Sequence, residues 1–132
     1  NKLPAAVLGL LIANVVVFAA GFLMPDISVR LVVAGALWYS SNEYFGVWQM
    51  VTYMFLHGGM GHIFFNMFAL VSFGRILETQ WGSARFLSFF FLCGLGAALI
   101  QTGINWYEVQ ALSDQMMAKG LKASVISELL TQ

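Results

Sequence analysis

The chain has 132 residues, of which 60% are hydrophobic and only 9% are charged. Soluble domains carry about 25% charged residues, so this composition is typical of a membrane protein. The formal net charge is zero and the basic residues form no cluster, which argues against nucleic acid as a partner. The single cysteine, Cys93, allows no disulfide within the chain, and we interpret it as a small buried packing residue.

The first predicted membrane helix covers residues 3–25, a run of 23 residues without a charge. About 20 apolar residues are enough to cross a bilayer as a helix. A cleaved signal peptide is the alternative, but its apolar core is typically about 7–15 residues long, which favours a retained helix. Asn14, in the middle of this run, is predicted to form a hydrogen bond to another helix.

Residues 26–61 form a long connection in which apolar and polar residues alternate irregularly. Amphipathic aromatic side chains, which prefer the headgroup region of a bilayer, are concentrated here. They are Trp38, Tyr39, Tyr44, Trp48 and Tyr53. The segment therefore predicts a structured interfacial loop lying against the membrane, followed by a tight glycine-rich turn at residues 58–61.

Two further membrane helices are predicted at residues 62–78 and 86–107, with a turn at Trp81-Gly82-Ser83 between them. The second of these runs is uncharged, and its small residues favour close helix packing. They are Gly94, Gly96, Ala97 and Ala98. Residues 109–132 are more polar, and their apolar residues recur at helical spacing, which predicts one amphipathic helix or two separated at Gly120. The fold class is therefore an all-α membrane protein with three transmembrane helices and an interfacial loop.

The distribution of basic residues predicts a cytoplasmic N-terminus. In that orientation Lys2, Arg75 and Arg85 lie on the cytoplasmic side, and Arg30 lies on the other. Basic residues are enriched in cytoplasmic loops, so three against one favours this topology, although Lys119 and Lys122 weaken the bias.

His62 and Asn66 are the polar residues with the clearest chemical potential. They are one helical turn apart in an otherwise apolar run, and polar groups are expensive to place in a membrane helix. Both side chains donate hydrogen bonds, so together they could stabilise an oxyanion, which is worth roughly 3–4 kcal/mol per donor. A metal site with His57 is disfavoured, because the spacing is poor and no further ligand is near. A polar pair that only joins helices remains an alternative.

The surrounding residues resemble the rhomboid family of intramembrane serine proteases. The matching residues are Trp48, Thr52, His57, the run from His62 to Asn66, Gly74, Glu78, Trp81-Gly82-Ser83 and Phe86. The resemblance implies that residues 1–108 are the N-terminal half of a six-helix bundle and that residues 109–132 lead toward the fourth helix. The Phe-rich sequence with its Gly-Gly turn is most similar to bacterial members, which implies a bacterial inner (cytoplasmic) membrane.

The resemblance also implies roles for individual residues. His62 and Asn66 would be the catalytic residues that stabilise the oxyanion. Trp48 would anchor the interfacial loop, His57 would be structural where the loop meets the helix, and Glu78 would tie the cytoplasmic end of that helix to its neighbours. No metal or cofactor is implied. One departure is Gln49, which follows Trp48 where the family often has an arginine.

The nucleophile and the general base of the family are not found in the chain. Rhomboid proteases carry a serine in a Gly-x-Ser-Gly segment on the fourth helix and a histidine base on the sixth, and none of the serines here lies in that motif. We therefore expect a fragment without peptidase activity of its own, whose partners are the missing C-terminal half, the lipid bilayer and transmembrane protein substrates. The alternatives are a non-catalytic rhomboid-like protein that binds transmembrane clients and an unrelated three-helix membrane protein.

Overall fold

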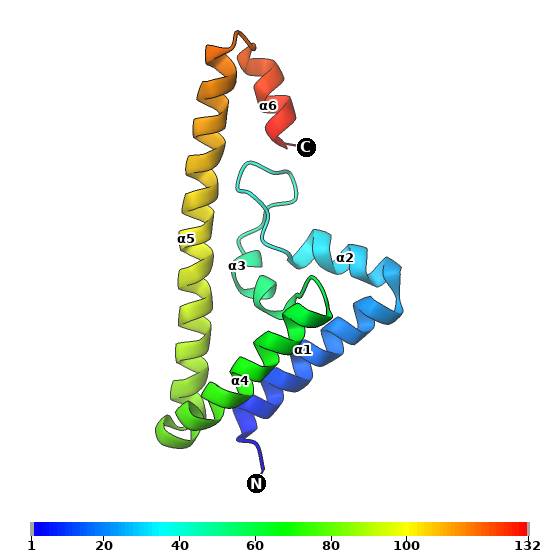
Figure 1. Cartoon of the computed structure of the whole chain (residues 1–132), viewed down its shortest axis with the longest axis vertical. Helices are drawn as coiled ribbons and strands as arrows, with labels where there is room; N and C mark the ends of the chain where they lie inside the picture. The colour runs from blue at the N-terminus through cyan, green and yellow to red at the C-terminus, as the bar shows by residue number, and fades with distance from the viewer. Residues whose placement is uncertain (1, 132) are drawn as a thin grey trace.

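The computed structural model describes residues 2–131, which form helices and loops without any strand (Figure 1). The helices are α1 (Ala5–Leu23), α2 (Pro25–Gly35), α3 (Gln49–Thr52), the short 3-10 helix η1 (Tyr53–Phe55), α4 (Met60–Trp81), α5 (Ser83–Ala118) and α6 (Ala123–Thr131). Within this range, α1, α4 and α5 are long and apolar enough to cross a membrane. The predicted all-α fold with three membrane helices is confirmed.

The helix ends differ from the predicted ones. The first helix ends before Pro25, because this proline opens α2 at its first turn. The third membrane helix continues past residue 107 to Ala118, and its 36 residues correspond to about 54 Å, more than the roughly 30 Å hydrocarbon layer. Residues 108–117 include no glycine or proline, so the change in polarity at residue 108 marks a change of surroundings and not the end of the helix.

Gly120 lies between α5 and α6, which agrees with the predicted alternative of two helices separated at this residue. Its φ of 89° lies in the left-handed region that glycine adopts without strain. From there α6 folds back along the end of α5 (Figure 1), with Ile126 buried.

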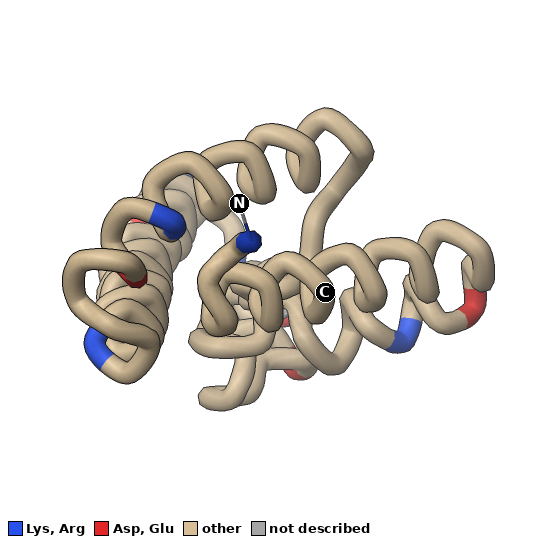
Figure 2. Tube along the Cα trace, turned by 90° about the horizontal axis from the view of Figure 1, so that it is seen from below, with Lys and Arg blue, Asp and Glu red and all other residues tan. Residues whose placement is uncertain are grey.

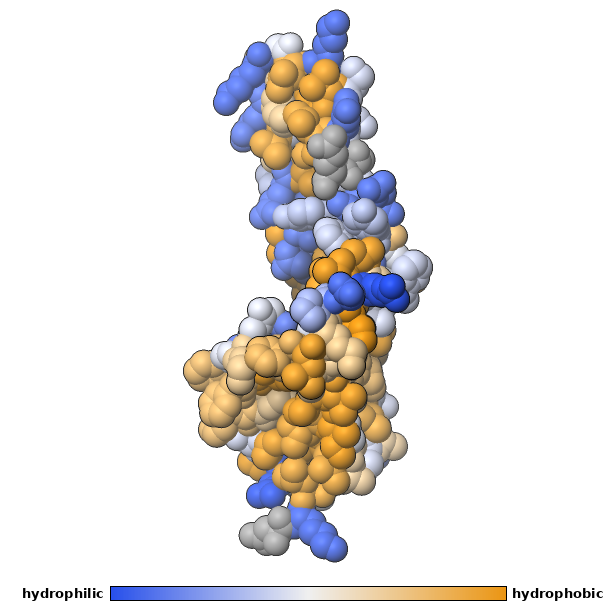
Figure 3. Space-filling model, turned by 90° about the vertical axis from the view of Figure 1, so that its right-hand side faces the viewer, coloured by the Kyte–Doolittle hydropathy of each residue, from blue (hydrophilic) through white to orange (hydrophobic). Residues whose placement is uncertain are grey.

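On the face shown in Figure 3, hydrophobic side chains dominate the lower part of the molecule, where α1 and α4 lie. Hydrophilic residues gather around the upper end, which holds α6 and the end of α5. Charged residues are sparse along the tube of the chain (Figure 2), in keeping with the 9% charged composition. This division predicts that the lower part is embedded in lipid and the upper part is in water.

The core lies where α1 crosses α4 and the start of α5. Val7, Leu10 and Phe86 are buried there together with Ala6. Gly74 allows the close approach of α4 to α1, since a Cβ atom at this position would lie 2.9 Å from Cγ2 of Val7. The hydrophobic core cluster therefore lies where the start of α1, the end of α4 and the start of α5 meet.

Two predictions about single residues are wrong for the described chain. The side chain of Asn14 is buried, but Nδ2 donates a hydrogen bond of 2.7 Å to the carbonyl oxygen of Leu10 in its own helix, and not to another helix. The carbonyl one turn earlier can be reached by a short amide side chain, so it competes with a partner on a neighbouring helix. Cys93 is exposed and borders an open pocket between α4 and α5.

Candidate active site

His62 and Asn66 occupy the first two turns of α4, next to the glycine turn that precedes it. Gly59 is the N-cap of α4, in extended conformation, and both polar side chains are exposed. Nδ2 of Asn66 donates a hydrogen bond of 2.7 Å to the carbonyl oxygen of His62. Nδ1 of His62 accepts a hydrogen bond of 3.2 Å from the backbone N–H of Gly58. The two side chains are thus one turn apart, each retains N–H groups that can donate, and both are open to a further binding partner.

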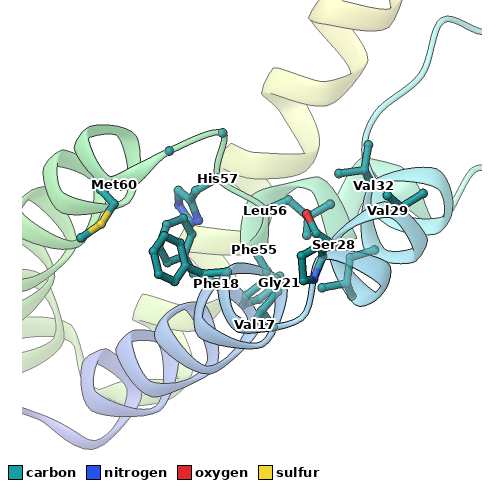
Figure 4. A pocket seen from close by; sticks show the side chains of 15 residues that line it. Val17, Phe18, Gly21, Ser28, Val29, Val32, Phe55, Leu56, His57 and Met60 are labelled. Atoms are coloured by element: carbon teal, nitrogen blue, oxygen red, sulfur yellow. The ribbon is translucent and has the colours of Figure 1, made fainter.

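His57 lies beside His62 at the end of the interfacial loop. The two rings are 5.1 Å apart between centroids and meet at 70°. His57 is partly buried, and its Nδ1 atom has no hydrogen-bond partner among residues 2–131. The ring borders an apolar cavity of about 610 Å³ between α1, α2 and the turn before α4, close to Phe18 (Figure 4).

No group of three metal-ligating side chains occurs within the part of the chain that the structure describes. His57 and His62 are therefore brought together as neighbouring rings, without a third histidine, cysteine or carboxylate to complete a metal site.

The pKa of His57 gives a testable pH dependence. Burial first, and then the neighbouring His62 ring, lower the pKa of His57 below its usual value of 6.5. The unfolded state then binds a proton more readily than the folded state, so we expect the free energy of unfolding to fall as the pH drops below about 6.5 and to level off below the folded pKa. His57→Gln should remove this part of the pH dependence in denaturant titrations at pH 5, 6, 7 and 8. An equal slope in the variant and the wild type would contradict the assignment.

Gln49 is the centre of the interfacial loop, a role that sequence reasoning missed. Its side chain is fully buried and makes four hydrogen bonds to the backbone. Oε1 accepts from the N–H groups of Trp38 at 3.4 Å and Gly46 at 3.1 Å, and Nε2 donates to the carbonyl oxygens of Ala34 at 3.3 Å and Tyr44 at 2.7 Å. An amide can make four such bonds, so the side chain is saturated.

The loop is further attached through three side chains that follow Gly46. The indole N–H of Trp48 donates to the carbonyl oxygen of Ala34 at 2.7 Å, although the ring is 59% exposed. The hydroxyl of Thr52 donates to the carbonyl oxygen of Gly35 at 2.7 Å, and the hydroxyl of Tyr53 donates to that of Gly94 in α5 at 2.6 Å. These bonds hold α2, α3 and α5 together around the loop. The predicted anchoring role of Trp48 stays a prediction.

Glu78 lies at the opposite end of α4 from His62, about 24 Å away along the helix axis. Its carboxylate is 4% exposed and accepts hydrogen bonds from the backbone N–H groups of Ala6 and Val7, both at 2.8 Å, and from the hydroxyl of Ser83. The N-cap of α1 is Pro4, which provides no side-chain cap. Glu78 therefore caps α1 from a different helix, at the end where the helix dipole favours a negative charge.

The structure thus brings His57, His62 and Asn66 together at one end of α4. It leaves Trp48 on the surface of the loop and Glu78 in the core at the other end. The one sequence signal for Gln49 was its position after Trp48, and that signal could not identify backbone partners that lie up to 15 residues away.

The chain resembles known proteins over the same region that holds these residues. The sequence model described as "Rhomboid domain" matches residues 44–113. RHOMBOID-like protein 6, mitochondrial, of Arabidopsis thaliana is 32% identical over 84 residues, which cover 64% of this chain and 27% of that protein. Inactive RHOMBOID-like protein 8 of Arabidopsis thaliana is 31% identical over 75 residues, which cover 57% of this chain and 21% of that protein. Rhomboid protease AarA of Providencia stuartii is 30% identical over 80 residues, which cover 61% of this chain and 28% of that protein.

The chain spans less than a third of the length of these relatives. No solved structure matches it. The relatives come from a plant and from bacteria, so the bacterial origin stays a prediction. The match covers more than half of the chain, including the loop with Gln49 and the turns of α4 with His62 and Asn66, and the chain belongs to the rhomboid family.

Proposed function

We propose that the protein carrying this chain is a rhomboid-type intramembrane serine endopeptidase, which cleaves peptide bonds in or near transmembrane segments of other membrane proteins. Residues 1–108 would be the N-terminal half of its membrane domain, and residues 109–132 would lead toward the fourth helix. The N-terminus would be cytoplasmic, in a bacterial inner membrane. The observation that carries the proposal is the pair of exposed donors, His62 and Asn66, one turn apart at one end of a membrane helix.

The chemistry follows from the donors. When a serine hydroxyl adds to the carbonyl carbon of a peptide bond, a histidine base takes the hydroxyl proton and the carbonyl oxygen becomes an oxyanion. His62 and Asn66 would donate hydrogen bonds to this oxyanion, where water is scarce and each bond is therefore strong. The serine and the base would come from residues outside this chain, so the chain alone would not cleave a substrate.

The test is a cleavage assay with the full-length protein and a single-span membrane substrate in liposomes. We expect His62→Ala and Asn66→Ala each to lower kcat about a hundredfold, with unchanged unfolding transitions. Gln80→Ala, at the exposed far end of α4, is the matched control and should retain activity. Full activity in both variants would overturn the oxyanion assignment.

The second proposal is a non-catalytic rhomboid-like protein that binds transmembrane clients. It is supported by the similarity to a relative whose name describes it as inactive. Under this proposal the wild-type protein would co-purify with membrane substrates and leave them intact, whereas the endopeptidase would yield two defined fragments from each substrate molecule.

A further inference from the structure

We infer that the backbone N–H of Gly58 selects the tautomer of His62 and so makes Nε2 the proton-bearing donor of the site. The catalytic consequence of this inference rests on the proposed oxyanion role of His62, whereas the tautomer itself follows from the hydrogen bond alone. The bond from the Gly58 N–H to Nδ1 of His62 measures 3.2 Å, and Nε2 has no hydrogen-bond partner among residues 2–131.

The tautomer follows from the direction of this bond. A neutral imidazole carries one proton, on either Nδ1 or Nε2, and a backbone N–H can only donate. Nδ1 must therefore offer its lone pair to Gly58, and the single proton resides on Nε2. In the other tautomer, two N–H groups would face each other at Nδ1, and Nε2 would present a lone pair where the oxyanion is expected. The oxyanion would then lose a donor and meet a repulsive lone pair.

The position of His62 in α4 explains why its ring reaches Gly58. Gly59 is the N-cap, so His62 is the third residue of the helix, and side chains in a helix point back toward its N-terminus. In a capping box, a glutamate at this position accepts a hydrogen bond from the backbone N–H of the N-cap residue. Here an imidazole nitrogen accepts instead from Gly58, the residue before the N-cap Gly59, and the bond also orients the ring.

The ring of His57 provides a second restraint. It packs edge-on against His62 at 5.1 Å and limits rotation of that ring about its side-chain bonds. The N–H of Gly58 thus determines which nitrogen of His62 carries the proton. The ring of His57 and the geometry of α4 determine the orientation of the His62 ring. Gly58 acts through His62 and is a positioning residue, since its backbone has no need to touch the substrate.

The experiment compares Gly58→Pro with Gly58→Ala in the full-length protein. Proline removes the N–H, whereas alanine retains it. Alanine fits at this position, because its Cβ atom would meet nothing within 4 Å and the φ of Gly58 is not positive. Because proline also restricts His57, replacing the Gly58 amide by an ester with glycolic acid is the second variant, which removes only the N–H.

The first readout is the ¹⁵N NMR spectrum of the His62 ring at pH 8, which distinguishes the two tautomers without any substrate. We expect the Nε2–H tautomer in the wild type and in Gly58→Ala, and a mixture of both tautomers in the proline and ester variants. A wild-type His62 with its proton on Nδ1 would overturn the inference, even if neither variant folds.

The second readout is the cleavage reaction. We expect kcat to fall about tenfold in the proline and ester variants, with KM within twofold of the wild type, because the loss is confined to the transition state. Unchanged tautomers in both variants would contradict the inference directly. If the tautomer responds as expected but His62→Ala remains fully active, the proposed function fails and the inference about the tautomer stands.

Discussion

Replacing Glu78 by alanine is expected to lower the free energy of unfolding by roughly 3–5 kcal/mol, more than we expect for any other single substitution in the chain. The variant leaves the N–H groups of Ala6 and Val7 and the hydroxyl of Ser83 without their shared acceptor. The two N–H groups belong to residues of the core cluster around Val7 and Phe86, where water cannot replace the carboxylate at low cost. Denaturant unfolding in detergent micelles measures the loss.

Glu78→Gln keeps the size of the side chain but removes its charge and one of its two acceptor oxygens. Its single oxygen can accept from one of the two N–H groups, while its NH₂ group meets the other donor, so we expect about half of the alanine effect or more. Glu43→Gln, at an exposed position of the loop, is the matched control and should change stability by less than about 0.5 kcal/mol. Equal stability of Glu78→Gln and the wild type would refute the view that the carboxylate caps α1.

Substitution of Gln49 should have the second-largest effect, and we expect Gln49→Ala to cost roughly 3 kcal/mol. Three backbone groups, in Trp38, Tyr44 and Gly46, lose their side-chain partner at once, while the carbonyl of Ala34 keeps its bond from Trp48. The side chain that joins residue 34 to residues 38–46 is also gone. Hydrogen exchange should show faster exchange of the amides of Trp38 and Gly46, with much smaller changes in α4. Gln110→Ala, at an exposed position of α5, is the control.

Charged variants of Gln49 test whether the loop needs both the donor and the acceptor atoms of the amide. Gln49→Glu retains the acceptors for two N–H groups but turns oxygen atoms toward the carbonyls of Ala34 and Tyr44. Gln49→Arg provides donors only, which suit those carbonyls but oppose the N–H groups of Trp38 and Gly46. We expect neither variant to restore the stability of the wild type. If arginine restored it, the loop would have to rearrange around the new side chain.

The membrane helices could be predicted from the sequence because each is long and mostly apolar with few charged residues, and the length needed to cross a bilayer is a fixed physical quantity. The end of α5 could not be predicted in the same way. Hydropathy reports which residues lie in lipid, whereas the helix itself ends only at Ala118, two residues before Gly120, whose φ is left-handed.

Individual polar residues were predictable to very different degrees. His62 and Asn66 stand out because polar groups in an apolar run are costly, and their shared face follows from helical spacing alone. The partners of Gln49 lie up to 15 residues away and depend on how the chain folds back, which local spacing does not show. Asn14 instead bonds the carbonyl of Leu10 one turn earlier, and hydropathy alone could not decide between this carbonyl and a neighbouring helix. The catalytic roles of His62 and Asn66 stay predictions until activity is measured.

The connection between α4 and α5 consists of Gly82 alone, and this restricts how the region can change in length. Its φ of 86° and ψ of 163° form a conformation that is essentially confined to glycine. One additional residue here, if absorbed into α5, would turn that helix by about 100° about its axis. The carbonyl of Gly94 would then rotate away from the hydroxyl of Tyr53. A single-codon insertion at Gly82 would therefore break the contact between α5 and the interfacial loop, although the sequences of α4 and α5 themselves would be unchanged.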